Sequence, residues 1–412
     1  MKILIYTIVV FLILHCTLYI DNCICQWVQY EFIGGVSVYS FAVSGNNPED
    51  SGQVIFAGTD NGVFLSTNNG QNWTQTALTY WSHSLAVSGN NPEDSGQVIF
   101  AGTINYGVYL STNNGVTWTQ TALNNRTVYS IAVSGNNIFA GTQGAGVYLS
   151  TNNGQNWTQT SLNNQTVRSL AFSVNNIFAG TAAGGVYFSA NNGQNWTQTS
   201  LNNQWVYSLA ISGNNIFAGT SQYGVYLSTD NGSTWTQTAL NNRMVYGLAI
   251  SGNNIFAGTN DYGVYLSTNN GQSWIQKNQG FPNIIDVYSL LIANNYIFAG
   301  TDGYSVWRRE LAEIIGIQNI STEIPAAYSL EQNYPNPFNP VTKIRFAIPK
   351  NEIVTLKIFD LLGREAAILV NEKLQSGIYE TTFDASMLPS GVYFYSLNAG
   401  DFKETKRMIL VR

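Results

Sequence analysis

The chain repeats a unit of 39 to 45 residues over most of its length, and this repeat constrains the fold more than any other feature. The unit is clearest over residues 128–159, which read VYSIAVSGNNIFAGTQGAGVYLSTNNGQNWTQ. Its tryptophan recurs six times, and the last four intervals between tryptophans are 39 residues each. A unit of this length cannot bury its apolar face alone, so the units must stack on one another.

Each unit contains four short runs that are rich in β-branched and aromatic residues. In the third unit these runs are VYSIAVS, NIFAGT, GVYLST and WTQTSL. Such residues favour strands, whereas the intervening Ser-Gly-Asn-Asn and Asn-Asn-Gly segments are typical of tight turns. Four antiparallel strands in each unit are typical of a β-propeller blade.

The two ends of the array predict seven blades and a closed ring. Six units are complete, whereas a seventh begins at Val287 and has only three strand-like runs before Arg309. The segment QWVQY at Gln26–Tyr30 matches the NWTQT that opens the fourth run elsewhere. This N-terminal strand can complete the last blade and so remove the exposed sheet edges. We therefore predict an all-β chain in which residues 26–309 form a seven-bladed β-propeller.

Residues 1–25 have the features of an export signal. Lys2 precedes a mostly apolar run from Ile3 to Ile20, and small side chains at Cys23 and Cys25 suit cleavage before Gln26. The alternative is an uncleaved membrane anchor, since a run of about 18 apolar residues can just span a bilayer. Cleavage would remove all three cysteines. The mature chain is then expected to have no disulfide and no stable membrane span.

The charge balance argues against a nucleic-acid partner. The chain has 17 Lys and Arg against 23 Asp and Glu, and its net charge is −6. Phosphate binding needs clustered positive charge, which this composition does not supply.

A second domain follows a linker predicted at residues 310–327. Residues 328–412 contain alternating strand-like runs, which predict a small antiparallel Ig-like β-sandwich. They include NYPNPFNPVTKIRF, VTLKIFDLLGRE, LPSGVYFYSL and the terminal KETKRMILVR. In these segments and their order the domain resembles the type A sorting domain of the bacterial type IX secretion system. The resemblance implies export from a Gram-negative cell to the outer-membrane surface or the extracellular space, with the type IX machinery as a partner.

The repeated tryptophan segments resemble the Asp-box, Ser-x-Asp-x-Gly-x-x-Trp, of the BNR repeats in sialidase-like propellers. The fifth segment keeps the aspartate as Asp230, and the other five carry asparagine. Either residue can hydrogen-bond to the backbone of its own turn, and glycine supplies a positive φ. The resemblance places these boxes in peripheral turns, where they support the fold rather than chemistry.

The sequence gives little support for catalysis. A sialidase needs an arginine cluster, an activated tyrosine and acidic partners, but the propeller has only five arginines. Glycosidases need two carboxylates about 5–10 Å apart, and no acidic pair recurs outside the two PEDSGQV insertions. With two histidines in the chain, one of them in the signal, a metal cluster is not expected. We predict no catalytic residue, no metal site and no cofactor.

The repeats differ most at the connections between their second and third runs and between one unit and the next. Both kinds of connection lie on the same face of a propeller, and here they carry aromatic, arginine and acidic side chains that suit ligand contact. The alternative is that these loops drifted after duplication. The candidate ligand-binding residues are Trp81, His83, Tyr106, Arg126, Arg168, Trp205, Tyr223, Arg243, Asp261, Tyr262, Asp302 and Tyr304.

Two of these candidates interrupt a ring of tyrosines. The second residue of the first run is tyrosine in five units, whereas it is His83 in the second unit and Arg168 in the fourth. The tyrosines are expected to pack near the axis, and the two exceptions could face a polar ligand.

These features favour a secreted or surface-attached propeller that acts as a binding or adhesion module for an extracellular glycan or protein. The first alternative is a glycoside hydrolase of the sialidase-like propeller type. The second is a passive structural or assembly-factor propeller, because near-identical blades leave little sign of a tailored site.

Overall fold

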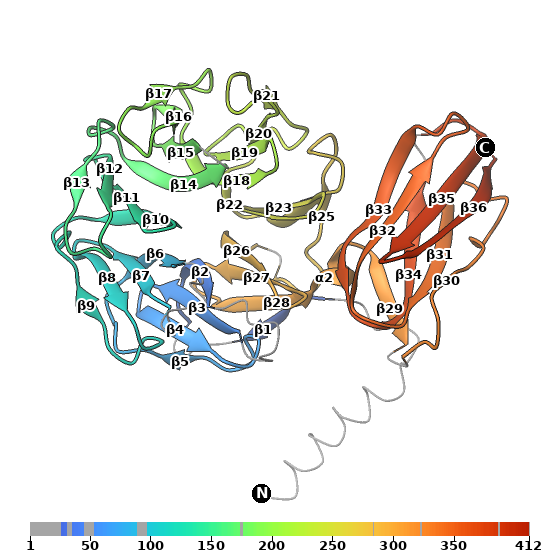
Figure 1. Cartoon of the computed structure of the whole chain (residues 1–412), viewed down its shortest axis with the longest axis horizontal. Coiled ribbons are helices and arrows are strands. Elements are labelled where there is room, and N and C mark those ends of the chain that lie inside the picture. The colour runs from blue at the N-terminus through green and yellow to red at the C-terminus, as the bar shows by residue number, and fades with distance from the viewer. Residues whose placement is uncertain are drawn as a thin grey trace, which may run out of the picture.

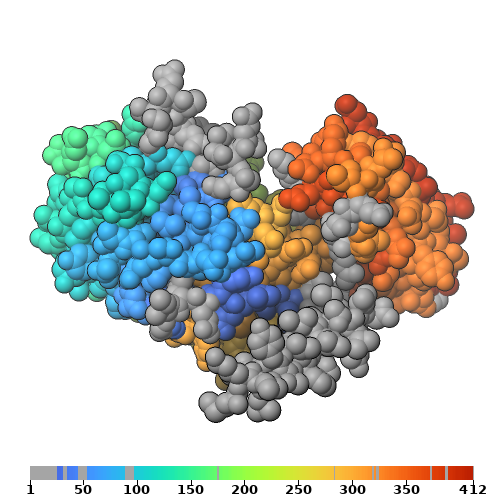
Figure 2. Space-filling model, turned by 90° about the horizontal axis from the view of Figure 1, so that it is seen from below, coloured from blue at the N-terminus to red at the C-terminus, as the bar shows by residue number. Residues whose placement is uncertain are grey.

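The computed structural model describes residues 26–30, 35–44, 53–88, 97–173, 176–282, 284–321, 324–385 and 388–411. The predicted export signal and most of both PEDSGQV insertions lie outside these ranges. The described chain forms a ring of seven four-stranded sheets followed by a two-sheet sandwich (Figure 1). In the space-filling view the sandwich stands beside the propeller as a second lobe (Figure 2). In the described part, no helix has the length and apolar character needed to cross a membrane.

Each of the seven sheets of the ring is an antiparallel blade, and in six of them the strands follow the chain from the axis to the rim. We number the blades 1 to 7 in the order of their inner strands. The inner strands are β2 (Val38–Ser44), β6 (Ser82–Val87), β10 (Val128–Ser134), β14 (Val167–Ser173), β18 (Val206–Ser212), β22 (Val245–Ser251) and β26 (Val287–Ala293). The second strands are β3 (Val54–Thr59), β7 (Ile99–Thr103), β11 (Asn137–Thr142), β15 (Asn176–Thr181), β19 (Asn215–Thr220), β23 (Asn254–Thr259) and β27 (Tyr296–Thr301).

The third and fourth strands complete the blades. The third strands are β4 (Gly62–Ser66), β8 (Gly107–Ser111), β12 (Val147–Ser150), β16 (Gly185–Ser189), β20 (Val225–Ser228), β24 (Gly263–Ser267) and β28 (Val306–Glu310). The outer strands of blades 1 to 6 are only two residues long: β5 (Thr74–Gln75), β9 (Thr119–Gln120), β13 (Thr158–Gln159), β17 (Thr197–Gln198), β21 (Thr236–Gln237) and β25 (Ile275–Gln276). Glutamine side chains extend the pairing, as where Gln159 donates to the Ala145 carbonyl at 2.9 Å.

The N-terminal strand closes the ring as the sequence predicts. Strand β1 (Val28–Tyr30) pairs with β28 and so supplies the fourth strand of blade 7. Gln29 donates to the Tyr304 carbonyl at 3.0 Å, which is the bond that the outer glutamines make in other blades. Trp27 is fully buried and stacks on Phe281 with ring centroids 4.7 Å apart. The seven-bladed propeller is confirmed.

The blades are joined by the phenylalanine and glycine of the repeated IFAGT segment. Phe139 on β11 is fully buried and belongs to the apolar cluster of the next blade, with Val167 and Ile177. A Cβ on Gly141 would lie 2.7 Å from Cγ1 of Val167, so only glycine allows the neighbouring blade this close. Burial of these interlocked side chains stabilises the ring.

The tryptophan segments form turns with internally satisfied hydrogen bonds. In blade 3 the Ser150 hydroxyl accepts from the Gly154 amide at 2.9 Å and donates to Asn152 at 3.1 Å. Asn153 and Gly154 both have positive φ values, 53° and 79°, which suits an asparagine–glycine pair. Trp157 donates to Thr121 of the preceding blade at 3.2 Å. In blades 2, 3, 4 and 6 these turns therefore hold both the hairpin and its neighbour, whereas Trp73 and Trp235 donate to glycine carbonyls of their own turns.

The segment predicted as a linker contains elements that pack on both domains. Helix α2 (Leu311–Ile314) buries Leu311 and Ile314 in the cluster of Trp27, and β29 (Ile317–Ser321) pairs with a strand of the sandwich. Because Leu311 and Ile314 are apolar and become buried, the segment folds instead of forming an extended linker.

The C-terminal domain is a sandwich of two four-stranded sheets. One sheet contains β29, β34 (Gly377–Asp384), β31 (Val341–Ile348) and β30 (Ser329–Leu330), in that order. The other contains β33 (Glu365–Leu374), β32 (Glu352–Phe359), β35 (Gly391–Ala399) and β36 (Phe402–Leu410). The predicted sandwich is confirmed. Charged side chains of this domain form ion pairs, as where Glu380 contacts both Lys343 and Arg345.

Candidate ligand-binding site at the channel mouth

A β-bulge in every inner strand shapes the mouth of the central channel. In blade 3 the register shifts between Val128, which pairs with Thr142, and Ser130, which pairs with Gly141. The residue between them, Tyr129, is therefore the extra residue of the bulge. The same shift occurs at the same position in the six other inner strands. Bulges re-aim side chains, and here they turn the second residue of each inner strand towards the axis.

These seven second residues form a closed collar in which each member contacts the next. Tyr288, Tyr39 and His83 stack with ring centroids 5.2 and 5.1 Å apart, and His83 meets Tyr129 edge-on at 5.0 Å. Arg168 continues the collar on the far side of Tyr129. The circuit is completed by edge-on contacts at 5.4 and 5.0 Å that link Tyr207, Tyr246 and Tyr288.

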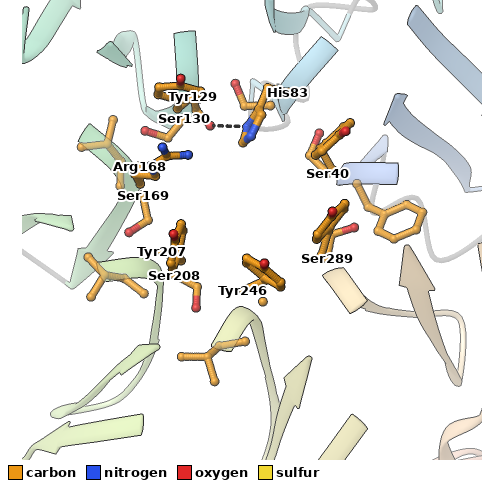
Figure 3. A pocket seen from close by; sticks show the side chains of 18 of the residues that line it. Ser40, His83, Tyr129, Ser130, Arg168, Ser169, Tyr207, Ser208, Tyr246 and Ser289 are labelled. Carbon is orange, nitrogen blue, oxygen red and sulfur yellow. Dashed lines mark hydrogen bonds between the residues drawn. The ribbon is translucent and has the colours of Figure 1, made fainter. Parts of the chain in front are cut away.

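The collar surrounds a cavity of about 530 Å³. Its wall consists of the collar and of the next two residues of each inner strand, a polar or small one and then an apolar one. Figure 3 shows His83 and Arg168 among the tyrosines around the open centre. A cavity of this size with a few convergent polar groups is typical of a small-molecule or side-chain binding site.

His83 is held as a neutral acceptor in the collar. Its Nδ1 lies 3.1 Å from the Tyr129 carbonyl oxygen, and because a carbonyl only accepts, Nδ1 carries the proton. Burial is the main cause that lowers the pKa of His83 to about 4, and the positive charge of Arg168 lowers it further. The neutral ring therefore leaves Nε2 as an acceptor.

Arg168 is a cation without an ionic partner. Its guanidinium carbon lies 4.4 Å from the ring centroid of Tyr129 and 5.4 Å from that of Tyr207. It forms no ion pair with any residue that the structure describes, and its buried Nε has no hydrogen-bond partner there. Two rings thus hold the guanidinium group by cation–π contacts and leave it available to an anion.

Carboxylates gather on the opposite side of the mouth. Ser37 lies directly before β2, and its hydroxyl donates to Asp302 at 2.6 Å while its amide donates to Asp60 at 3.4 Å. The Asp261 amide donates to the Asp286 carboxylate at 2.6 Å. Burial raises the pKa of Asp60 and of Asp286, and the other carboxylates raise them further.

The same carboxylates act on the collar. Burial raises the pKa of Tyr246 to about 12, and nearby Asp286, Asp261 and Asp302 add to the effect. Burial and Asp302 likewise raise the pKa of Tyr288. The phenols on this side of the mouth therefore keep their protons at physiological pH.

An outer rim of exposed aromatic side chains surrounds the mouth. Trp81 approaches Tyr39 with ring centroids 5.4 Å apart, and Tyr106 stacks on Tyr80 at 4.4 Å. In each of the other members, more than two-fifths of the residue's surface is exposed: Trp205, Tyr223, Tyr262 and Tyr304.

The structure brings only some of the predicted site residues together. His83 and Arg168 lie in the collar, and Trp81 lies beside it. Arg243 lies 3.8 Å above the Tyr262 ring on the rim, and Arg126 is exposed. Their roles in ligand binding stay predictions.

Sequence reasoning missed Asp60 and Asp286 as members of the site. Asp60 and Asp302 occupy equivalent positions in their repeats, each directly after the threonine that ends the second strand. Asp286 directly precedes an inner strand, as Ser37 does. The repeat register could have shown that these positions meet at one junction. In the described part of the chain, no group of three or more His, Cys, Asp or Glu side chains is arranged to hold a metal ion.

Comparison with known families supports the two-domain architecture. Residues 332–411 match the family described as a secretion system C-terminal sorting domain, and residues 96–205 match the one described as the DUF6242 beta propeller domain. The protein is therefore a propeller exported by the type IX secretion system, whose machinery its sorting domain contacts. Its location is the outer-membrane surface or the extracellular space, as predicted. No curated protein matches the sequence significantly.

Solved structures share the propeller fold at low identity. YCF48 from Cyanidioschyzon merolae is 13% identical with a TM-score of 0.54, and the match covers 70% of this chain and 99% of that one. YCF48 bound to D1 peptide is 14% identical with a TM-score of 0.53, covering 71% and 98%. The computationally designed Ika8 protein is 14% identical with a TM-score of 0.50, covering 69% and 99%. At these identities the likeness concerns the fold alone.

Proposed function

We propose that the protein is a non-catalytic binding or adhesion module that holds an extracellular glycan or protein at the mouth of its channel. The observation that carries this proposal is the collar, where five tyrosines are interrupted by an unpaired Arg168 and a neutral His83. A collar that served packing alone would not need an arginine without an anionic partner. The exposed rim adds flat aromatic surfaces on which sugar rings or peptide groups stack.

Two further points support a binding role. A solved propeller with the same fold has a peptide bound, so the scaffold is compatible with such a ligand. The tryptophan turns, which we infer to be Asp-box turns in which asparagine replaces aspartate in five of six, hold the blades through their own hydrogen bonds. The loop sequences on the opposite face are therefore not constrained by these turns.

The first experiment is an array screen of glycans and extracellular proteins with the chain of residues 26–412. A Trp205→Ala/Arg243→Ala variant tests the rim, and Val116→Ala is the control because this exposed residue lies in a tryptophan turn on the other face. We expect specific binding that the rim variant weakens and the control keeps. Absence of any specific ligand would contradict the proposal and favour a passive structural role.

Glycoside hydrolysis is a second candidate, favoured by one specific observation. Asp60 and Asp302 both contact Ser37, so two carboxylates converge at the mouth, and the pKa of Asp60 is raised as a general acid requires. Turnover of a glycoside that disappears in Asp60→Asn and in Asp302→Asn would favour this function over binding alone. Turnover that persists in both variants would assign it to a contaminant.

A further inference from the structure

Apart from Arg126 and Arg243 on the rim, the charged side chains at the mouth are segregated by sign. Asp60, Asp286 and Asp302 belong to blades 1 and 7, and Asp261 of blade 6 adjoins them through Asp286. Arg168 is on β14 of blade 4. In a ring of seven, blade 4 stands opposite the junction of blades 7 and 1. The mouth therefore has an anionic side at the junction of blades 7 and 1 and a cationic side at blade 4.

These opposite charges do not neutralise each other. None of the four carboxylates forms an ion pair with a described residue, and neither does Arg168. Burial is the main cause that raises the pKa values of Asp60 and Asp286, and repulsion from the neighbouring carboxylates raises them further. A bound cation would relieve this repulsion.

Buried polar atoms in the cavity wall also lack partners. Ser84 is 6% exposed and Ser130 is 8% exposed, and neither hydroxyl has a hydrogen-bond partner among the described residues. The Nε of Arg168 is in the same condition. Unsatisfied buried polar groups cost free energy. The described wall contains six such atoms, with the hydroxyls of Ser40, Ser169 and Ser208 as the other three. A wall with six of them is less suited to a permanently apolar filling than to a polar ligand.

Resting on the binding function proposed above, we propose that the mouth takes a zwitterionic ligand in one orientation. Its ammonium group lies against the carboxylates of blades 7 and 1, with the hydroxyls of Tyr39 and Tyr288 as further acceptors. Its carboxylate lies against the guanidinium group of Arg168, which can bind it with two parallel hydrogen bonds. An organic cation suits this site better than a metal ion, because no described set of ligands is arranged for a metal.

The test is calorimetric titration of the chain of residues 26–412 with linear ω-amino acids of increasing length. Alkylamines and alkanoates of the same lengths carry only one of the two charges. We expect affinity to peak at one length, where the zwitterion binds at least about tenfold more tightly than either analogue. Arg168→Gln should abolish its advantage over the amine, and Asp302→Asn should reduce its advantage over the alkanoate, because Asp60 and Asp286 remain.

The controls are Arg407→Gln and Asp401→Asn, which change the same charges at exposed positions in the sandwich. Zwitterions that bind no better than the singly charged analogues at any length, or that do not bind, would overturn the inference. Equal weakening by the control variants would also overturn it. If the array yields a ligand whose affinity Arg168→Gln and Asp302→Asn leave unchanged, the inference fails while the binding function stands. If the array yields none, the binding function itself fails.

Discussion

The buried serine side chains at the two ends of a blade differ in their hydrogen bonding. At the end with the tryptophan turn, Ser150 of blade 3 is 1% exposed and both donates and accepts a hydrogen bond. At the mouth of the same blade, Ser130 is 8% exposed and its hydroxyl has no partner among the described residues. Six turns have the first arrangement, whereas the mouth gathers charges without described ion-pair partners from four blades.

This contrast separates what folds the ring from what it can hold. A turn whose donors and acceptors are already hydrogen-bonded to one another gains nothing from a ligand. The same turn can therefore recur in successive blades. A mouth that leaves Arg168 without an ion pair to any described residue and brings Asp60 close to Asp302 has unsatisfied groups, and a ligand that satisfies them gains binding free energy. Substitutions at the two ends should therefore affect different properties: stability at one end and binding at the other.

The largest contrast is expected between two large aromatic residues. Phe139→Ala removes a fully buried ring from the core between blades and should lower the free energy of unfolding by about 3–5 kcal/mol. Trp205→Ala removes a ring that is 47% exposed on the rim and should change stability by no more than about 0.5 kcal/mol. Urea unfolding of both variants checks the pair, and equal losses would contradict the division.

The pH dependence of His83 should give the next largest effect. Its pKa is about 4 in the folded protein against 6.5 for a free histidine, so the unfolded chain binds the proton more readily. The contribution of His83 to stability is thus complete above pH 6.5 and declines as the pH falls towards 4, by roughly 3 kcal/mol. Asp60 and Asp286, whose pKa values are raised, act in the opposite direction, because their protonation favours the folded state.

His83→Tyr isolates the histidine from those carboxylates. Unfolding of this variant and of the wild type should be measured in parallel between pH 7 and pH 4. The difference in their stabilities should grow in favour of the variant as the pH falls. A constant difference would mean that His83 is not held neutral in the collar.

The smallest contrast compares the two buried serines of blade 3. Ser150→Ala leaves the Gly154 amide without its acceptor and should cost about 1–2 kcal/mol. Ser130→Ala removes a hydroxyl that has no partner and should be neutral or slightly stabilising. Thermal unfolding resolves this difference, and a larger loss for Ser130→Ala would show that its hydroxyl is satisfied after all.

The repeat made the blade, its four strands and the ring closure predictable, because a tryptophan equivalent to Trp157 recurs in every complete unit, with 39 residues in each of the last four intervals. The bulge at Tyr129 was not predictable, since a single extra residue leaves the strand-like pattern of VYSIAVS intact. The approach of Asp60 to Asp302 was hidden for a different reason. These residues are far apart in the sequence and meet only because the first and last blades close on Ser37.

The most direct test of the account is the affinity of a collar variant for the ligand found on the array. His83→Tyr/Arg168→Tyr makes the collar a uniform ring of tyrosines, which the five other blades already accommodate. Titration calorimetry and thermal unfolding should be run on the same preparations. We predict that this variant folds as well as the wild type at pH 7 and loses at least about tenfold in affinity. Unchanged affinity in a stable variant would contradict the claim that the mouth is the binding site.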